Sequence, residues 1–291
     1  MSLQLDARQR AMLGEMGLRF FEPQSHGRID DTPAEPARRA GGKPAGTAGI
    51  VKAQASVESA TDFIALNDHS IRAEGQFDSK NSAGAGLEAR PAGIASMQWD
   101  ALAQAVAGCR ACALCNSRRN TVFGVGSPAQ GPGVAPQADW LIVGEAPGEN
   151  EDLQGEPFVG QAGKLLDNML KALGLDRHNK VYITNVLKCR PPANRNPQPE
   201  EVAQCEPFLR RQVQLLQPRI ILAMGRFAVQ ALLRTDEPIG KLRGRAHSYH
   251  GIPVVVTYHP AYLLRNLPDK AKAWADLCLA MELMESAPAA A

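Results

Sequence analysis

From residue 98 onward, short apolar runs alternate with stretches of helical periodicity. Four of the runs have the length and the aliphatic, β-branched character of buried strands. They are Trp140 to Gly144, Val181 to Leu187, Ile220 to Met224 and Val254 to Tyr258. Runs that are apolar throughout are typical of parallel strands covered on both faces. The pattern therefore predicts an α/β fold with a three-layer, doubly wound, mainly parallel sheet of four strands.

Helical stretches separate and follow these predicted strands. Residues Gly163 to Leu173 place leucine and methionine at the three- and four-residue spacing of one helix face. Pro199 to Leu216 opens with Pro-Glu-Glu, and a helix N-terminus favours both proline and acidic side chains. Two more helices are predicted at Arg226 to Arg234 and at Lys270 to Met284. The alternation of strands and helices supports parallel crossover connections.

The first hundred residues lack this alternation. Residues 22–97 are rich in Gly, Ala, Pro, Ser and Asp, without a sustained apolar period to offset the entropy of ordering them, so we predict a disordered linker. Residues 1–21 contain a short amphipathic segment, and we predict that residues 5–21 dock onto a partner protein. The alternatives are that this segment folds back onto the main domain or has no role. The main domain is predicted at residues 98–286 and is followed by a tail at 287–291.

The composition also bears on the cellular compartment in which the protein works. There is no run of about 18 apolar residues, and the first residues lack the basic-then-apolar order of a secretory signal. We therefore expect a monomeric, cytoplasmic protein that makes no use of a membrane. In that reducing compartment the six cysteines are not expected to form structural disulfides. A regular cysteine spacing then indicates metal ligation or redox chemistry.

The net charge of +2 is unevenly divided along the chain. Residues 1–100 hold 11 Lys and Arg against 13 Asp and Glu, a charge of −2. Residues 101–291 hold 21 against 17, a charge of +4, so the basic part is the predicted α/β domain. An excess of this size permits contact with a nucleic-acid backbone without requiring it.

Unusual residues stand at the carboxyl ends of the predicted strands, where open α/β sheets bind ligands. An acidic Gly/Pro loop, residues 144–152, follows the first strand, Asn185 lies near the end of the second, Gly225 follows the third and His259 follows the fourth. The loop lacks the Lys-Ser/Thr ending of a P-loop and the glycine spacing of a dinucleotide fold. An amide and an imidazole at one mouth suit a flat heterocycle with carbonyl and N–H edges. Taken singly, Asn185 also suits a turn cap and His259 a structural role.

Four cysteines form two pairs with the spacing of metal ligands. Cys109 and Cys112 make a C-x2-C motif, and fifteen residues separate Cys189 from Cys205. A site of four thiolates holds either zinc or an iron-sulfur cluster, and the spacing alone does not distinguish the two. Cys115 follows the first pair closely and either replaces one of the four ligands or is a spectator.

Three motifs at the strand ends belong together. They are Gly144-Glu145-Ala146-Pro147-Gly148 with its continuation Gly155 to Gly160, then Thr184 to Pro192, and finally Tyr258 to Arg265. With the cysteine pairs, they resemble the signatures of family 4 uracil-DNA glycosylases over roughly residues 98–285.

The resemblance implies both an activity and a cofactor. The activity is hydrolysis of the N-glycosidic bond of deoxyuridine in DNA, which releases uracil, leaves an abasic site and initiates base-excision repair. Uracil-containing DNA is then the partner, and the cytoplasmic protein is expected to associate with the nucleoid. The cofactor is a 4Fe-4S cluster, held away from the base pocket by Cys109, Cys112, Cys189 and Cys205.

The resemblance also implies roles in the pocket. Phe158 is expected to stack on the flipped uracil, Asn185 to hydrogen-bond its polar edge and His259 to reach its O2. Backbone of Glu145, Ala146 and Pro147 is expected to line the same pocket. Other uracil glycosylase families carry Asp or Asn at the position of Ala146, so the candidates for activating water are Glu145 and Glu151. The alternatives are that Glu145 only braces its loop and that Glu151 shapes the pocket against the methyl group of thymine.

Contact with DNA is expected from residues around the mouth of the pocket. We predict that Arg190, Arg195 and Arg265 bind the backbone, and that Tyr262, Leu263 and Leu264 insert into the gap left by the flipped nucleotide. The alternative for these three residues is a hydrophobic start to the final helix. The wider set of basic candidates also includes Arg118, Arg119, Lys164, Lys188, Arg243 and Arg245.

Two rival functions use the same features. In the first, the protein binds uracil-containing or damaged DNA without cutting it, because the usual Asp of the loop is missing. In the second, the cysteines hold zinc, and the protein is a scaffold that recruits a repair partner through its N-terminal segment. Excision of uracil would exclude the first, and the colour of an iron-sulfur cluster would exclude the second.

Overall fold

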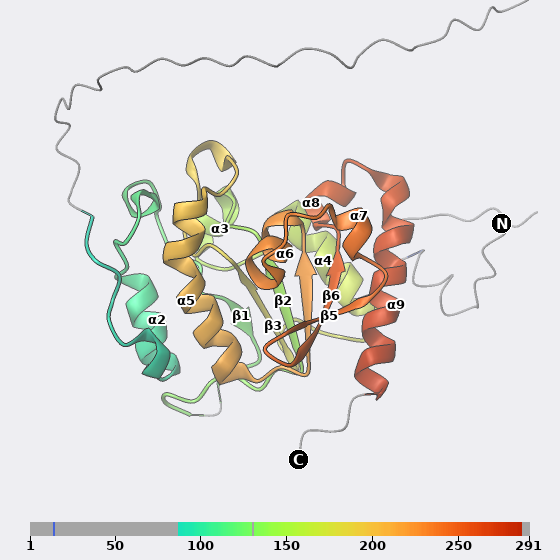
Figure 1. The fold of residues 1–291 in the computed structure, drawn as a ribbon, viewed down its shortest axis with the longest axis horizontal. Helices are drawn as coiled ribbons and strands as arrows, with labels where there is room; N and C mark the ends of the chain where they lie inside the picture. Colours follow the sequence, from blue (N-terminus) through green and yellow to red (C-terminus); the bar gives the residue numbers. More distant parts are fainter. Residues whose placement is uncertain (1–13, 15–86, 130, 287–291) are drawn as a thin grey trace, which may run out of the picture. The chain divides into compact units, whose positions relative to one another are not determined.

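The computed structural model of the protein describes residue 14 and residues 87–129 and 131–286 (Figure 1). The predicted docking segment, the tail at 287–291 and the predicted linker up to residue 86 lie outside the described residues, Gly14 excepted. The predicted main domain lies almost entirely within them.

A mixed sheet forms the centre of the described region, with strand order β1-β3-β2-β4-β6-β5. The four inner strands are parallel and are β2 (Trp140–Gly144), β3 (Val181–Asn185), β4 (Ile220–Met224) and β6 (Ile252–Thr257). These are the four predicted strands, and every residue of β2, β3 and β4 is buried. The chain runs from β2 outward to β3 and then back past β2 to β4, which is the reversal of direction that opens a crevice at the carboxyl ends of the strands.

The prediction of four strands was incomplete, because the sheet has six. The missing strands are the antiparallel edges β1 (Val125–Gly126), which pairs with β3, and β5 (Ala246–Tyr249), which pairs with β6. β1 is too short to show a period, and β5 is a largely exposed edge without an apolar run. A two-residue turn joins β5 to β6, and its His250 and Gly251 both have positive φ, 49° and 83°, as a type I′ hairpin requires.

Helices cover both faces of the sheet and complete three layers (Figure 1). One face is covered by α4 (Gln161–Ala172), α8 (Pro260–Leu263) and α9 (Lys270–Ser286). The other is covered by α2 (Trp99–Ala107), α5 (Pro199–Leu216) and α6 (Arg226–Leu233). Alternate strand residues enter the two cores: Trp140 and Ile142 pack on the first face, Leu141 and Val143 on the second. The short helices α3 (Glu149–Gln154) and α7 (Ile239–Leu242) were not predicted.

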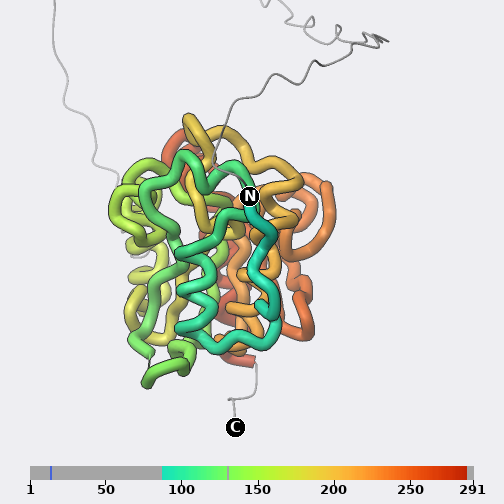
Figure 2. Tube along the Cα trace, turned by 90° about the vertical axis from the view of Figure 1, so that its left-hand side faces the viewer, coloured from blue at the N-terminus to red at the C-terminus, as the bar shows by residue number. Residues whose placement is uncertain are grey.

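The segment before β1 lies against α5, as Figures 1 and 2 show. Leu102 and Val106 of α2 pack with Phe208 of α5 in a small separate core. Arg211 of α5 reinforces this contact, because its Nε donates to the carbonyl of Met97 at 2.8 Å. This packing places the turn after α2, which contains the first two cysteines of the chain, beside α5. No helix within residues 87–129 and 131–286 is long and apolar enough to cross a membrane.

Candidate active site and cysteine cluster

A cavity of about 780 Å³, called the central cavity below, opens at the carboxyl ends of the parallel strands. Each inner strand contributes the residues that follow it or end it: the loop after β2, Asn185 of β3, Gly225 after β4 and His259 after β6. The structure brings the predicted pocket residues together on its wall: Glu145, Ala146, Pro147, Phe158, Asn185 and His259. Carboxylate, amide, imidazole and aromatic ring thus share one space.

Asn185 is a buried amide that the protein leaves incompletely paired. Its residue is 1% exposed, and its Oδ1 atom has no hydrogen-bond partner within the described part of the chain. Leaving such a buried polar atom unpaired costs about 1–3 kcal/mol. A ligand edge that offers a donor and an acceptor side by side would satisfy the amide.

Gly144 leaves the space that this amide and Phe158 occupy. Gly144 and Asn185 are opposite each other in the pairing of β2 with β3. A Cβ atom on Gly144 would lie 2.4 Å from Asn185 Oδ1 and 2.6 Å from Phe158 Cζ, closer than real Cβ contacts come. The last residue of β2 therefore has to be glycine for both side chains to reach the cavity.

Phe158 holds an unusual backbone conformation. Its φ is 56°, in the left-handed region, which is strained for a bulky side chain and costs on the order of 1–3 kcal/mol. The side chain is 5% exposed and its ring stacks on His259, with centroids 5.4 Å apart and planes 30° apart. Strain of this kind persists where surrounding contacts fix it, and here it presents the ring to the cavity.

His259 is held as a neutral imidazole with a defined tautomer. Its Nδ1 accepts the backbone N–H of Ala261 at 3.2 Å, so the ring proton is on Nε2. Burial lowers the pKa of His259 to about 4, and the charge of Arg265 lowers it further while that of Glu151 opposes the shift. The ring is therefore an N–H donor, and not a cation, near pH 7.

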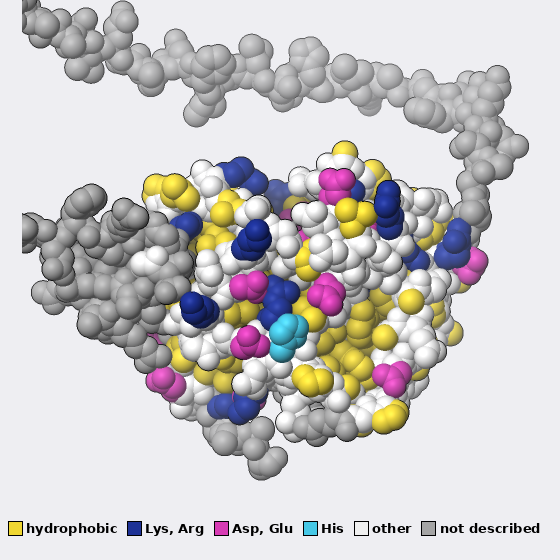
Figure 3. Space-filling view, turned by 180° about the vertical axis from the view of Figure 1, so that it is seen from behind, with side chains coloured by type: hydrophobic (Ala, Val, Ile, Leu, Met, Phe, Trp, Pro, Cys, Tyr) yellow, Lys and Arg dark blue, Asp and Glu magenta, His cyan; other side chains and the backbone are white. Residues whose placement is uncertain are grey.

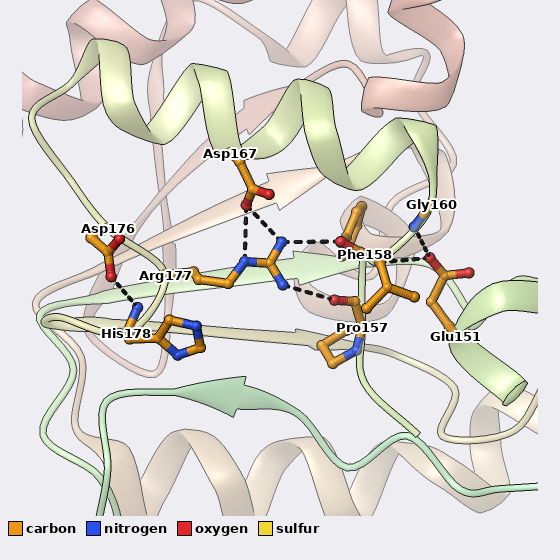
Figure 4. Close-up of polar contacts among 9 residues, drawn as sticks. Glu151, Pro157, Phe158, Gly160, Asp167, Asp176, Arg177 and His178 are labelled. Carbon is orange, nitrogen blue, oxygen red and sulfur yellow. Dashed lines mark hydrogen bonds and ion pairs between the residues drawn. The ribbon is translucent and has the colours of Figure 1, made fainter. Parts of the chain in front are cut away.

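Glu151 is occupied by the backbone around it. Its Oε1 accepts the N–H groups of Val159 at 2.9 Å and Gly160 at 3.1 Å (Figure 4). Its Oε2 accepts the N–H of Gly148 at 3.1 Å. Both oxygens are thus engaged at the start of α3 and at the turn before α4. The carboxylate thus acts as a brace for the loop, while Glu151 also lines the central cavity.

Glu145 has the opposite character. Like Glu151 it lines the central cavity, but burial raises the pKa of its carboxyl to about 7, an effect that the nearby charge of Arg226 partly offsets. A carboxyl group with this pKa changes protonation state close to neutral pH. Of the two predicted carboxylates, Glu145 is the one whose pKa lies near neutral pH.

The residues predicted to contact DNA fall into different environments. Arg195, Tyr262 and Arg265 line the central cavity. Arg195 is also bound to Glu201, with Nη1 donating to Oε2 at 3.0 Å, and the Tyr262 hydroxyl donates to Asp269 at 2.6 Å. Arg190 is held by two other residues: its Nε donates to Asn194 Oδ1 at 2.8 Å, and its guanidinium pairs with Glu149 at 3.7 Å.

Leu263 corrects one of these predictions. Its side chain is fully buried in the core beneath α8, so it is not placed to insert into DNA, whereas the next residue, Leu264, is 43% exposed. The motif places two leucines in succession, and only the helix orientation decides which one faces outward.

Three cations of the wider basic set are likewise taken up inside the protein. Lys188 is 1% exposed, Arg118 binds the sulfur of Cys189, and Arg243 pairs with the buried Asp276 at 2.9 Å. On the face shown in Figure 3, Lys and Arg side chains are interspersed with Asp and Glu.

The predicted cysteine ligands come together in a second cavity, beside α5. It is lined by Cys109, Cys112, Cys115, Cys189 and Cys205. These residues come from the turn after α2, the loop after β3 and α5 itself. Two N–H donors point at sulfur: Arg118 Nη1 lies 3.0 Å from Cys189 Sγ, and the backbone N of Lys188 lies 3.3 Å from Cys205 Sγ. Donors in these positions suit sulfurs that carry negative charge.

The sulfur set fits an iron-sulfur cluster. The thiols of Cys109, Cys112, Cys189 and Cys205 line one small cavity, and cysteine thiolates are the usual protein ligands of such clusters. The same four thiols would also suit zinc, so the lining alone does not distinguish the two. Burial raises the pKa of Cys205 to about 12, and of the neighbouring thiols those of Cys189 and Cys112 raise it further, so a bound cation is what would make these thiols thiolates.

Lys188 connects the two cavities, a role that its sequence position did not indicate. Its Nζ donates to Thr184 Oγ1 at 2.6 Å, to the carbonyl of Asn185 at 2.8 Å and to Gln212 Oε1 at 2.6 Å. The same residue donates its backbone N–H to Cys205. One buried side chain thus ties the end of β3 to α5, between the cysteines and the amide of Asn185.

Comparison with known proteins supplies independent support. A family model described as the uracil DNA glycosylase superfamily matches residues 132–278. A type-4 uracil-DNA glycosylase of Saccharolobus solfataricus is 40% identical over 198 residues, 65% of this chain and 88% of that protein. The corresponding protein of Archaeoglobus fulgidus is 43% identical over 173 residues (57% and 82%), and that of Sulfurisphaera tokodaii 44% over 170 residues (55% and 73%). The family match contains the whole wall of predicted pocket residues and two of the four paired cysteines.

Proposed function

This chain belongs to the uracil-DNA glycosylase superfamily, among its type-4 members, and from that premise we propose that uracil is released from DNA in the central cavity. The observation that carries the proposal is the buried amide of Asn185, whose Oδ1 has no partner among the described residues, beside a neutral His259 and a stacked Phe158. The activity is hydrolysis of an N-glycosidic bond, which begins DNA repair. The binding-only alternative is not favoured, because relatives that share about 40% of the sequence are named as glycosylases.

Recognition begins when the nucleotide leaves the base stack, at a cost of a few kcal/mol. Inside the cavity, the ring of Phe158 offers a flat apolar face to the base. The amide of Asn185 pairs with the adjacent N3–H and O4 of uracil, where cytosine would present a ring nitrogen and an amino group. The unpaired Oδ1 then acquires the partner that the protein itself does not supply.

Bond cleavage separates charge, positive on the sugar and negative on the departing base. The Nε2–H of His259 donates to O2 and Asn185 donates to O4, so both stabilise the uracil anion more than the bound substrate. A neutral imidazole serves this purpose without first losing a proton, which is consistent with its lowered pKa. Each donor of this kind contributes on the order of 2.7–4 kcal/mol to the transition state.

We assign Glu145 to the water that attacks the sugar. Its carboxyl lines the cavity, while the adjacent Ala146 has no group for this task. In its ionised form Glu145 accepts a proton from water and its charge favours the cationic sugar. Glu151 acts through the loop, by holding the backbone on both sides of Phe158.

Replacing Glu145 by Gln is expected to change the pH dependence of excision. Because burial raises the pKa of Glu145 to about 7, kcat/KM of the wild type should rise with pH through about 7 and then level off. Glu145→Gln should react more slowly and lose this rise between pH 5 and 8, since His259, with a pKa of about 4, stays neutral throughout. Single-turnover rates at five pH values measure both effects.

Stability provides the control for this variant. Ionising a carboxyl with a raised pKa costs the folded state stability as pH rises from the ordinary value of 4.5 to about 7. Glu145→Gln removes that cost, so its melting temperature at pH 8 should be no lower than that of the wild type. A rise in rate through pH 7 that persists in Glu145→Gln would assign the titration to another group.

Gly144→Ala is expected to lower excision by about tenfold to hundredfold, because displacing the amide or the ring by about 1 Å disturbs the reacting geometry. The added Cβ would meet Asn185 Oδ1 and Phe158 Cζ. Gly174→Ala, at a helix end with open space around it, is the control for substitution of a glycine as such, although its φ of 72° will cost some stability. Equal excision rates for Gly144→Ala and the wild type would mean that neither side chain has to be where the structure places it.

We further propose that Cys109, Cys112, Cys189 and Cys205 hold a 4Fe-4S cluster, with Cys115 as a neighbour and not a ligand. The support is that these thiols lie close enough to affect one another. Burial is the main cause of the raised pKa of Cys189, and Cys112 and Cys109 raise it further. Burial likewise raises the pKa of Cys205, and Cys189 and Cys112 raise it further. Cys115 lines the same cavity, and its thiol donates to Asn116 Oδ1 at 3.4 Å. When bound, the cluster supplies a cross-link between the turn after α2, the loop after β3 and α5.

DNA is proposed to cross the mouth of the central cavity, between Arg195 and Arg265. Their charges would hold the backbone while Tyr262 and the exposed Leu264 face the gap left by the flipped nucleotide. Arg190 would contribute after release from Glu149. We keep as proposals that residues 5–21 dock onto a partner protein and that the protein acts as a monomer at the nucleoid in the cytoplasm.

An excision assay tests the proposed function directly. Purified, cluster-loaded protein is incubated with single-stranded DNA containing one uracil, and with the same strand in U·G and U·A duplexes, followed by alkaline cleavage. We expect strand breaks at uracil in at least one substrate and none in a matched thymine strand. Tight binding without breaks in any substrate would support the binding-only protein instead. Iron and sulfide analysis of the same preparation separates a cluster from zinc.

A further inference from the structure

Arg177 lies outside every motif and yet binds the backbone of Phe158. It stands in the turn between α4 and β3, with its side chain 14% exposed. Its Nη2 donates to the carbonyl of Phe158 at 3.0 Å and its Nη1 to the carbonyl of Pro157 at 3.4 Å (Figure 4). The guanidinium therefore holds two successive carbonyl groups at the strained residue.

Asp167 orients this guanidinium. Arg177 Nε and Nη2 both donate to Asp167 Oδ1, at 2.9 Å and 2.6 Å. Asp167 belongs to α4, the helix that begins just after the Phe158 turn. The planar fork of arginine can bind a carboxylate with one edge and carbonyl groups with the other, which the single ammonium of lysine cannot reproduce.

The same turn is held from two other directions. Glu151 accepts the N–H groups of Val159 and Gly160, on the far side of Phe158 from Arg177 (Figure 4). Gly163 permits close approach of α4, since a Cβ there would lie 1.7 Å from the Phe158 carbonyl oxygen. The carbonyl of Phe158 is thus confined between the helix and the guanidinium.

We propose that Arg177 is a positioning residue that keeps Phe158 in its left-handed conformation and so directs its ring at the base. The proposal rests on the proposed function, in which that ring stacks on the flipped uracil. Arg177 does not touch the substrate; it acts through the Phe158 carbonyl. If Arg177 only braced the loop, its loss would change the stability of the protein, and the effect on the excision rate would not depend on the Phe158 ring.

The test begins with Arg177→Met, which keeps an apolar stem and removes the donors. We expect the single-turnover excision rate to fall about tenfold to hundredfold, as for a misplacement of about 1 Å. Arg177→Lys should recover only part of the loss, because it restores the charge but not the fork. Arg210→Met is the matched control: Arg210 also pairs with a carboxylate, Glu206 at 3.9 Å, but lies on α5 away from the cavity wall.

A double-mutant cycle with Phe158→Ala separates positioning from general weakening. If Arg177 acts through the ring, Arg177→Met should have almost no further effect on the rate once Phe158 is alanine. Losses that multiply in the double variant, or a wild-type rate for Arg177→Met, would overturn the proposal. Melting temperature and visible absorbance of each variant monitor the fold and the cluster.

Other outcomes are distinguishable. Absence of excision by the wild type would contradict the proposed function itself, and a wild-type rate for Phe158→Ala would contradict the role of the ring. Should Arg177→Met not fold, Asp167→Asn retains the arginine and weakens only its orientation. It should lower the rate severalfold, and again only while Phe158 is present. An Asp167→Asn rate equal to the wild-type rate would then count against the proposal.

Discussion

Asn185→Ala is expected to lower the single-turnover rate of uracil excision by about 100-fold to 1,000-fold, the cost of losing one donor that stabilises developing negative charge. The amide is buried and its Oδ1 has no partner in the described chain, so its hydrogen-bonding capacity is directed at the cavity. Truncation to alanine leaves in place the backbone carbonyl that accepts Lys188 Nζ. Excision by stoichiometric excess of enzyme over a uracil-containing strand measures the effect without product release.

His259→Ala extends this prediction to the second donor. It should lower the single-turnover excision rate by a similar factor. The double variant should be slower than either single variant, because the two groups act on different oxygens of the base. DNA binding and the visible absorbance of the cluster should stay at wild-type levels, since both residues lie at the central cavity and not at the cysteines. Asn179→Ala, at an exposed turn, is the control for loss of an amide. Parent rates in both single variants would show that the central cavity is not the site of chemistry.

Cys189→Ala is expected to cost the protein its cluster and much of its stability. Cys189 is 7% exposed, and its sulfur belongs to the set that joins three separate segments. Metal binding at structural sites of small proteins contributes on the order of 10 kcal/mol to folding. We therefore expect loss of iron and of broad visible absorbance, a large fall in melting temperature, and excision that falls with the folded fraction. Cys205→Ala should behave in the same way.

Cys115→Ala is the matched control, because this cysteine lines the same cavity but is not proposed as a ligand. It should retain iron, sulfide and colour. Loss of iron from Cys115→Ala together with full retention in Cys112→Ala would exchange the two residues in the ligand set. If Cys189→Ala kept full iron content and wild-type melting, the four-cysteine assignment would be wrong.

The division of roles between the two glutamates follows from which atoms surround each one. The acidic loop presents Glu145 and Glu151 six residues apart, and their chemical type is the same. In the folded chain both line the central cavity, but three backbone N–H groups bind the Glu151 carboxylate, whereas burial raises the pKa of Glu145. Equal candidates in the sequence thus become a brace and a titrating group.

The sequence by itself determined the inner sheet, the main helices, the family and the residues that form the pocket. Apolar runs and helical periods are local signals, and in a parallel sheet the carboxyl ends of strands necessarily meet. Asn185 and His259 were therefore placed together by topology alone. The cysteine pairs could also be found in this way, because the number of residues between the two cysteines of each pair is a property of the sequence.

Only the tertiary structure decided what depends on contacts between distant segments. The edges β1 and β5 are short or polar and exist through pairing with β3 and β6. Leu263 faces the core and Leu264 the solvent because of how α8 packs, and Lys188 is a buried link and not a surface cation because α5 supplies Gln212. The hydrogen bond from Arg177 to the Phe158 carbonyl joins residues that are nineteen apart in the sequence, a separation that no helix or strand period predicts. Burial and hydrogen-bond partners are properties of the folded chain, so the roles they assign could not be read from spacing.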